Sequence, residues 1–415
     1  MKYWNHALTG LLTCLLLAAS LPGLAAALPA AGYSTIIEQA MKNNPEIRAA
    51  EAALEAARSR LSGAGRPLNN PELEAEAEST DVETYTLGIS QTLDWHDKRA
   101  SLEQVARAEV DVVQASLDSL RLEKSATLLE ALGQVLTRQA TARLYQRRSR
   151  ILERFTRLAA KRHKAGDISR AELELARLSW SEAMMQEAAN QAALIQARSD
   201  YYAISGQLPD TSATLPDDLP LLEPLSDPDS MARRHPRVRR FLASARKLQL
   251  QIQATDRGRK ADPSIGIRAG REGNENLVGL SFSLPLQIRN DFRAEVDAAR
   301  ADALAAEKQA QQAFFNLRAR LRAAHASYDV MARAWRQWIS LGQDSLRQRA
   351  ALLETLWKSG EMGTTDYLLQ LQQTLDTRIA GAELQGELWR AWIEWLSASN
   401  GLHDWLNRNN KGNES

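Results

Sequence analysis

The sequence predicts a mainly α-helical protein with a small β part, built from two copies of one structural unit. Two short stretches have the two-residue apolar rhythm of β-hairpins, and each is followed by a long run with helical periodicity. Landmark residues recur at a nearly constant offset: Pro236 follows Pro45 by 191 residues, and Gly360 follows Gly166 by 194. A repeated β-hairpin that leads into a repeated long helix indicates an internal duplication.

Five segments are predicted along the chain. They are a signal peptide at 1–27, repeat 1 at 28–208, a proline-rich linker at 209–230, repeat 2 at 231–402 and a polar tail at 403–415. Within the repeats, we expect β-hairpins at 71–93 and 263–285, and turns of long helical hairpins near 164–169 and 358–364. The linker is expected to be an extended spacer, and the tail from residue 407 onward to lack regular structure.

The first segment has the three parts of a secretory signal. Lys2 precedes an apolar core at residues 11–17, and three small residues follow at 25–27. The single cysteine, Cys14, could instead be a lipidation site, but apolar residues continue well past it. After residue 27 no apolar run approaches the ~20 residues of a membrane-spanning helix. The expected mature protein is exported and cysteine-free.

Composition excludes one large class of function. The 415 residues carry a formal net charge of only +1, although 25% of them are charged. A bulk nucleic-acid binder usually concentrates basic charge on one face or tail, so no nucleic-acid partner is expected.

The predicted strands alternate strictly between apolar and polar residues. In the first hairpin, Leu73, Ala75 and Ala77 alternate with glutamates, and in the second, Val278, Leu280 and Phe282 alternate with glycine and serine. The alternating glutamates are Glu72, Glu74, Glu76 and Glu78. Each strand should therefore present one apolar and one polar face.

The long helical runs are too long for a compact domain. The run at 98–163 contains no proline and would be on the order of 95 Å long, so it must pack against other long helices. The second repeat has an unbroken seam with steps of three and four, which predicts coiled-coil packing. This seam comprises Phe314, Leu317, Leu321, Ala324, Tyr328, Met331, Trp335 and Trp338.

The helix turns have recognisable ends. Gly166 and Gly360 suit a left-handed helix end, and Ser169 with Glu172 forms a capping-box pattern at the start of the next helix.

Four strands cannot close a barrel, whereas three copies would supply twelve strands with a wide lumen. The alternative is a soluble four-stranded sheet packed on helices.

These features together resemble the TolC family of outer-membrane efflux ducts. The junctions at 87–93 with Lys98 and Arg99, and at 278–286 with Arg289, are similar to that family's strand-to-helix junctions. The turns at Gly166 and Gly360, each followed six residues later by an acid, are similar to its periplasmic tip turns. The resemblance covers nearly the whole mature chain, and is strongest to the outer-membrane subunits of cobalt-zinc-cadmium-type metal efflux systems.

The resemblance implies a homotrimer in which an α-barrel in the periplasm joins a 12-stranded β-barrel in the outer-membrane lipid of a Gram-negative bacterium. It implies two further partners: a periplasmic adaptor (membrane fusion) protein and an inner-membrane proton-driven efflux pump. The chain would be a passive exit duct, with no enzymatic activity and no cofactor, and heavy-metal cations are the candidate cargo. A duct for drug efflux or type I secretion, and a periplasmic coiled-coil scaffold without a pore, are the alternatives.

The same features of the sequence indicate candidate site residues. Gly166 and Gly360 mark the tips where an adaptor would dock, and Glu172 and Asp366 could ring a tip constriction or simply cap their helices. The family's further acid three residues after Asp366 is replaced by Leu369. Glu72, Glu74, Glu76 and Glu78 would line the lumen, with Arg268 offsetting part of their charge.

No catalytic or metal-binding constellation is expected from the sequence. The six histidines are scattered, and a mature cysteine is absent. His96, beside Asp94 and Asp97, could attract a cation or lie in a solvated polar junction.

Overall fold

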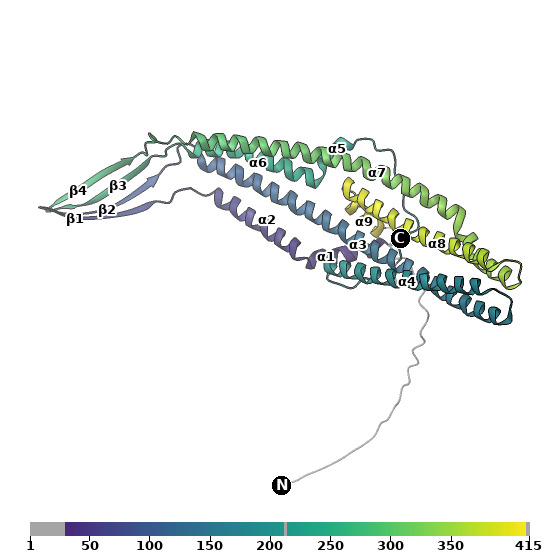
Figure 1. Ribbon diagram of the computed structural model, residues 1–415. Coiled ribbons are helices and arrows are strands. Elements are labelled where there is room, and N and C mark those ends of the chain that lie inside the picture. The colour runs from purple at the N-terminus through teal and green to yellow at the C-terminus, as the bar shows by residue number, and fades with distance from the viewer. Residues whose placement is uncertain (1–29, 211–213, 412–415) are drawn as a thin grey trace, which may run out of the picture.

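The computed structural model describes residues 30–210 and 214–411. The chain is elongated, with a four-stranded sheet at one end and two helix turns at the other (Figure 1). Its elements are α1 (Ala30–Asn43), α2 (Pro45–Ala64), β1 (Glu72–Ser79), β2 (Glu83–Thr92), α3 (Lys98–Ala165), α4 (Arg170–Ser205), α5 (Pro228–Arg234), α6 (Pro236–Gly258), β3 (Ser264–Glu272), β4 (Glu275–Ser283), α7 (Arg293–Lys358), α8 (Thr364–Ser399) and α9 (Leu402–Lys411).

The predicted fold class is confirmed: two long helical hairpins, α3–α4 and α7–α8, accompany two β-hairpins. The predicted signal peptide and Cys14 lie outside the described residues. Within 30–210 and 214–411, no helix is both long and apolar enough to cross a bilayer.

One antiparallel sheet joins the two repeats. Its strand order is β1-β2-β3-β4, and the central pair places Ile89 of the first hairpin opposite Ile267 of the second. β1 and β4 are left as open edges, and an open edge presents unpaired backbone N–H and C=O groups.

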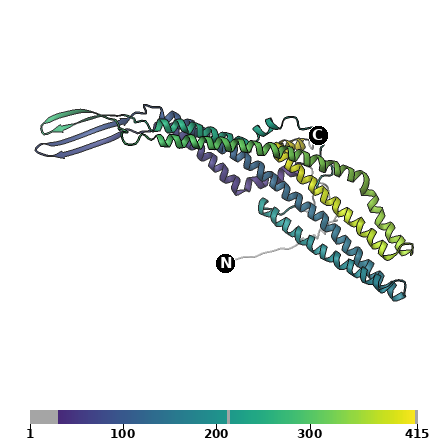
Figure 2. The ribbon, with the colours of Figure 1, turned by 45° about the horizontal axis from the view of Figure 1, so that its top comes forward.

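Each strand continues into a helix, and the helices keep the order of the strands. α2 leads into β1, β2 into α3, α6 into β3, and β4 into α7, while α2 packs on α3, α3 on α6, and α6 on α7. Toward the helix turns, α4 and α8 take the places of α2 and α6, so that α4 lies beside α3, α3 beside α8, and α8 beside α7. The chain is therefore a layer four elements wide, with β1, α2 and α4 at one edge and β4 and α7 at the other (Figures 1 and 2).

Local signals in the sequence set the helix boundaries. Asn44 caps α2 through its side-chain oxygen, and Pro45 occupies the first turn, where its missing N–H is not needed. At α4 the Ser169 side chain accepts from the backbone of Glu172 and the Glu172 side chain accepts from the backbone of Ser169, so the predicted capping box is present.

The main core lies midway along the helices, where α1, α3, α7, α8 and α9 meet. Trp389 of α8 is buried against α3 and donates its indole N–H to the carbonyl of Leu129 at 2.9 Å. Its ring occupies the space that a side chain at Gly133 would need, since a Cβ there would lie 2.1 Å from the ring. Tyr33 of α1 and Trp405 of α9 complete this aromatic cluster.

The linker is extended between residues 214 and 227, but it packs on the helical layer. Leu215 and Leu219 are buried, Tyr328 donates its hydroxyl to the carbonyl of Pro220 at 2.6 Å, and the indole of Trp335 donates to the carbonyl of Asp217 at 2.9 Å. The prolines keep this segment extended. Its leucines stabilise the bound position, because packing on α7 and α8 removes their apolar surface from water. Its last residues are helical, because α5 begins at Pro228.

The polar tail also differs from expectation. α9 extends through residue 411, beyond the predicted start of the irregular tail at 407. Leu402 and Leu406 are buried on one face of this helix, which explains why a mostly polar segment folds onto the core.

Candidate functional site in the sheet faces and the helix turns

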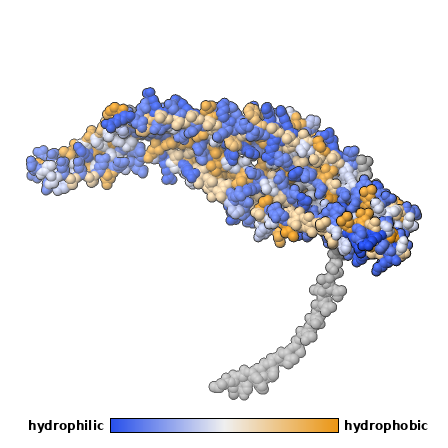
Figure 3. All heavy atoms as spheres, in the orientation of Figure 1, coloured by the Kyte–Doolittle hydropathy of each residue, from blue (hydrophilic) through white to orange (hydrophobic). Residues whose placement is uncertain are grey.

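The two faces of the sheet differ completely in chemistry. Strand register aligns Leu73, Ile89, Ile267 and Leu280 in one row of the apolar face. These side chains are exposed to solvent in a single chain: Leu280 is 84% exposed and Leu73 is 75% exposed. The hairpin ends farthest from the helices are hydrophilic in the space-filling view (Figure 3). An exposed apolar band bounded by a polar rim marks an interaction surface, for a protein partner or for a membrane.

The opposite face carries all four glutamates of β1. Glu74 accepts a hydrogen bond from the Ser90 hydroxyl at 2.7 Å, and Glu76 lies 3.5 Å from a guanidinium nitrogen of Arg268. The structure therefore brings Arg268 of repeat 2 to the glutamates of repeat 1. Both partners are about half exposed, and such ion pairs contribute only about 0 to 1 kcal/mol.

The paired glycines of the two hairpins make room for Arg268. Gly88, Arg268 and Gly279 are neighbours in one row across the sheet. A Cβ at Gly88 would lie 3.0 Å from the Cβ of Arg268, and one at Gly279 would lie 3.0 Å from its Nε. Gly279 follows Gly88 by 191 residues, the offset between the two repeats, so the sequence alone pairs these glycines. Their shared contact with Arg268 becomes visible only in the strand register.

The helix turns have the predicted left-handed glycines. Gly166 has φ +85° and Gly360 has φ +80°, a region that glycine adopts at little cost. No atom outside their immediate chain neighbours lies within 4 Å of a Cβ built at either position. Both glycines therefore lie in turns that are exposed at this end of the molecule.

The two turns are tied to each other by a residue that the sequence analysis missed. Arg162 donates to the carbonyl oxygens of Trp357 at 3.2 Å and of Lys358 at 3.0 Å, both in the last turn of α7, where carbonyl groups lack the usual intrahelical donors. Its guanidinium also lies over the Trp357 ring, 4.7 Å from the centroid. Phe155 and Tyr367 pack on the same ring, so both hairpins share one aromatic cluster.

The two candidate tip acids begin neighbouring helices. The backbone N–H of Ser169, then its hydroxyl, then that of Thr364 hold the pKa of Glu172 below its usual range. Glu172 therefore serves its own helix and also reaches the start of α8. Asp366 is exposed in the first turn of α8, where a negative charge is favourable.

The junction around His96 is arranged for helix capping. Both carboxylate oxygens of Asp94 accept from the start of α3, from the N–H of Lys98 at 2.7 Å and of Arg99 at 2.9 Å. Across the described ranges, no group of three or more His, Cys, Asp or Glu side chains is placed to hold a metal ion.

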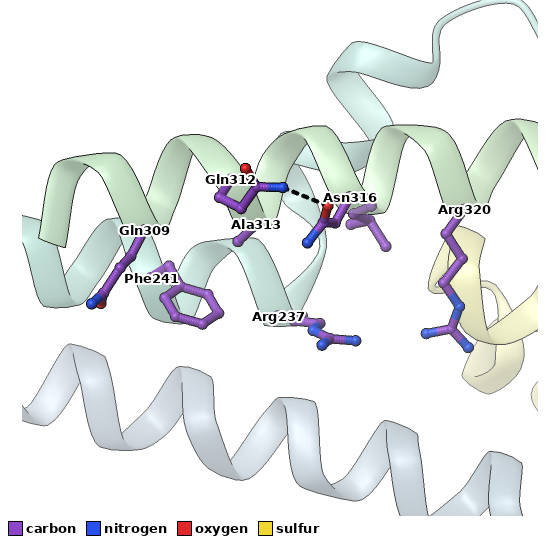
Figure 4. A pocket seen from close by; sticks show the side chains of 8 residues that line it. Arg237, Phe241, Gln309, Gln312, Ala313, Asn316 and Arg320 are labelled. Atoms are coloured by element: carbon purple, nitrogen blue, oxygen red, sulfur yellow. Dashed lines mark hydrogen bonds between the residues drawn. The ribbon is translucent and has the colours of Figure 1, made fainter. Parts of the chain in front are cut away.

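A cavity of about 270 Å³ lies in the helical layer between α6 and α7, on the side toward α3 (Figure 4). Glu394 holds Arg320 there through two hydrogen bonds of 2.6 and 2.7 Å, and this contact lowers the pKa of Glu394. The rest of the lining is mainly amides and cationic or aromatic side chains, which include Gln309, Gln312, Asn316, Arg237 and Phe241. No nucleophile and base converge in this lining.

Comparison with known proteins agrees with this architecture. Residues 36–207 match the family model described as outer membrane efflux protein. The cobalt-zinc-cadmium resistance protein CzcC of Cupriavidus metallidurans is 25% identical over 230 residues, which are 54% of this chain and 55% of CzcC. The aligned region thus spans about half the length of that curated relative.

Solved structures match over most of the chain. The outer-membrane channel OprN has a TM-score of 0.74 at 18% identity, covering 89% of this chain and 90% of OprN. CusC has a TM-score of 0.74 at 15% identity, covering 88% of this chain and 91% of CusC. At these identities the likeness establishes the shared fold. The family description and the OprN title both name the outer membrane, which is the predicted location. Residues 36–207, somewhat less than half of this chain, are thus similar to the outer membrane efflux protein family, in line with the resemblance carried by the repeated hairpins and helix turns.

Proposed function

We propose that three copies of this chain form an exit duct through the outer membrane, along which efflux substrates pass passively to the exterior. The observation that carries this proposal is the open layer. Sheet and helices end at the same two edges, and the sheet has one apolar face. Copies joined edge to edge would close both the strands and the helices into one continuous wall.

The chemistry of the sheet favours one orientation of this wall. The apolar face, with Leu73 and Leu280, would contact lipid, and the face with Glu72, Glu74, Glu76 and Glu78 would line the lumen. A trimer would place about twelve carboxylates there, partly offset by Arg268, and charged rings of this kind favour cations.

The wall would act without chemistry of its own, as one part of a three-component system. An adaptor protein would dock at the bare turns at Gly166 and Gly360, and an inner-membrane proton-driven pump would supply the cargo. Glu172 and Asp366 would lie near the entrance, where Glu172 remains foremost a helix cap. The apolar sheet face argues against a scaffold without a pore, which has no need for such a face.

Heavy-metal cations are the proposed cargo. CzcC is named as a cobalt-zinc-cadmium resistance protein, and its similarity to about half of this chain supports a metal efflux role over drug efflux or type I secretion. The acidic lumen face is consistent with cations but selects no particular metal.

Deletion of the gene and complementation in the native host would test the proposal. Loss of the chain should lower the tolerated concentration of cobalt, zinc or cadmium, and the wild-type gene should restore it. If only drug tolerance or protein secretion changes, the metal assignment is wrong. If none of these changes although the partner genes are expressed, the duct itself is contradicted.

Variants of the turns would test where an adaptor docks. Gly166→Val and Gly360→Val should lower resistance while protein level and oligomeric state stay unchanged. Gly206→Val is a matched control, because Gly206 also has positive φ (+68°) and open space but lies at the other end of α4. Equal loss of resistance in all three variants, or full resistance in all three, would remove the turns from the docking site.

A further inference from the structure

Cationic residues form one continuous line on the half of α3 that leads to its turn. Their steps along the helix alternate strictly between four and three residues, so they share one face. We call this set the α3 cationic stripe: Arg143, Arg147, Arg150, Arg154, Arg157, Lys161 and Lys164. All seven side chains are exposed, and the stripe is on the order of 32 Å long.

Few side chains of the same chain pair with the positive charges of the stripe. Among the described residues, two of the seven have a hydrogen bond or ion pair: Arg150 donates to Gln146, and Arg157 lies 3.5 Å from Glu153. Arginines off the stripe behave differently. The nearly buried side chain of Arg148 pairs with Asp376 at 2.6 Å, and Arg162 caps α7. The charge on the stripe therefore remains available to an external partner.

The duplicated helix supplies an internal comparison. Gly166 and Gly360 end equivalent helices, so each stripe position has a counterpart 194 residues later on α7. If long helices merely needed a charged solvated face, both copies should carry it. The counterparts include a single cation; they are Gln337, Leu341, Asp344, Gln348, Ala351, Thr355 and Lys358. The stripe is specific to repeat 1.

The position of α3 keeps the stripe clear of neighbouring copies. In this half of the molecule α3 lies between α4 and α8 of its own chain, while α4 and α7 form the open edges. The other side of α3 is occupied by the core that contains Leu152, Phe155 and Ala159. Edge-to-edge assembly would therefore leave the stripe uncovered.

We propose that the α3 cationic stripe docks an acidic amphipathic helix of a periplasmic partner, laid along α3. Charge complementarity calls for acidic side chains at matching three-and-four spacing. An apolar row, Leu144, Ile151 and Leu158, runs along one flank with a spacing of seven residues; all three are half-buried, and Ile151 and Leu158 pack against that core with part of their surface. A helix with leucines beside its acids would contact both rows, whereas a polyanionic glycan offers charge alone.

Peptide binding to the full-length protein in detergent would test this inference. The probe is a synthetic helical peptide of about 21 residues, with glutamates at three-and-four spacing beside a leucine row. Its counterpart has lysine in place of glutamate, and heparin serves as a polyanion without a helix. The acidic peptide should bind at least about tenfold more tightly than the lysine peptide, and high salt should weaken its binding.

Two variants with equal charge change locate the site. Arg147→Glu combined with Arg154→Glu should weaken acidic-peptide binding at least about tenfold. Arg60→Glu combined with Arg66→Glu changes two exposed residues near the end of α2 that leads to the sheet. This variant should bind the acidic peptide within about twofold of the wild type. Unfolding temperature and native mass, measured on the same samples, confirm that each variant is folded. Equal binding by both variants overturns the proposal, as does binding of heparin at the stripe without binding of the peptide.

The inference rests on the proposed function for the periplasmic location of α3, so the same preparations are assayed for conductance in lipid bilayers. Normal conductance with no peptide binding would reject the acidic partner alone. Absence of both a trimer and conductance would reject the duct, whatever the peptide does.

Discussion

Gly133 lies in the middle of α3, where glycine is normally unfavourable, because the indole of Trp389 packs against its backbone. Gly133→Ala should destabilise the protein by about 1 to 3 kcal/mol, since even a methyl group would overlap the ring. Gly63→Ala is the control: this helical glycine has open space, so alanine should be neutral or stabilising by up to ~1 kcal/mol. Thermal or denaturant unfolding of the purified proteins measures both, and equal effects would contradict the packing argument.

His235 gives the fold a sensitivity to acid. Its Nδ1 accepts from the N–H of Arg237 at 3.1 Å and its Nε2 donates to the carbonyl of Ser397 at 3.0 Å, so the buried ring is neutral. Burial lowers the pKa of His235. Its stabilising effect is therefore complete above about pH 6.5, the ordinary value, and is lost as pH falls from there through the lowered folded pKa.

His235→Asn should remove the pH-dependent contribution of this residue to stability, because asparagine can still cap α6 but does not titrate. The test compares unfolding temperatures of wild type and variant between pH 7.5 and about pH 5, around the ordinary histidine pKa. The difference between them should shrink toward low pH. His403→Asn, at an exposed position, should keep the wild-type profile. A constant difference for His235→Asn at every pH would contradict the titration argument.

At the scale of elements, the two faces of β4 should respond differently to charge. Leu280 points to the apolar face and Ser281 to the polar face. If the apolar face meets lipid at mid-bilayer, Leu280→Arg should cost about 2 to 4 kcal/mol per chain, while Ser281→Arg should be tolerated. The amount of folded protein in the outer-membrane fraction reports both. Equal tolerance at the two positions would favour a soluble sheet.

Periodicity predicted the elements well, because strands and long helices are defined by local patterns. The seam from Phe314 to Trp338 and the capping box at Ser169 could be found without any tertiary contact. The bound linker could not, since Leu215 and Leu219 depend on a surface formed by α7 and α8 more than a hundred residues away. α9 was missed for the same reason: its two buried leucines are too few to outweigh a polar composition in the sequence.

The candidate site was predicted in part for a similar reason. The glycines of the turns and the glutamates of β1 stand out locally, but Arg162 does not, because its role depends on the end of α7. The contact between Arg268 and Glu76 also needed the register that joins the two repeats. Residues whose partners lie in the other repeat were the ones that local patterns could not assign.

At the scale of the whole molecule, the layer should close only between chains. β1 and β4 are separated by two strands, so their nearest backbones within one chain are about 14 Å apart, well beyond disulfide reach. The residues expected in the mature chain contain no cysteine. Cysteines introduced in pairs along β1 and β4, for example Ala75→Cys with Val278→Cys, should therefore link separate chains and give dimers and trimers on a denaturing gel. Either single variant should give no ladder beyond a dimer.

The most direct test of the central claim is the native mass of the purified protein in detergent. We expect a single species of three chains, because the sheet and the helical layer share two open edges that close together. A stable monomer or dimer under conditions where the protein is folded would contradict it.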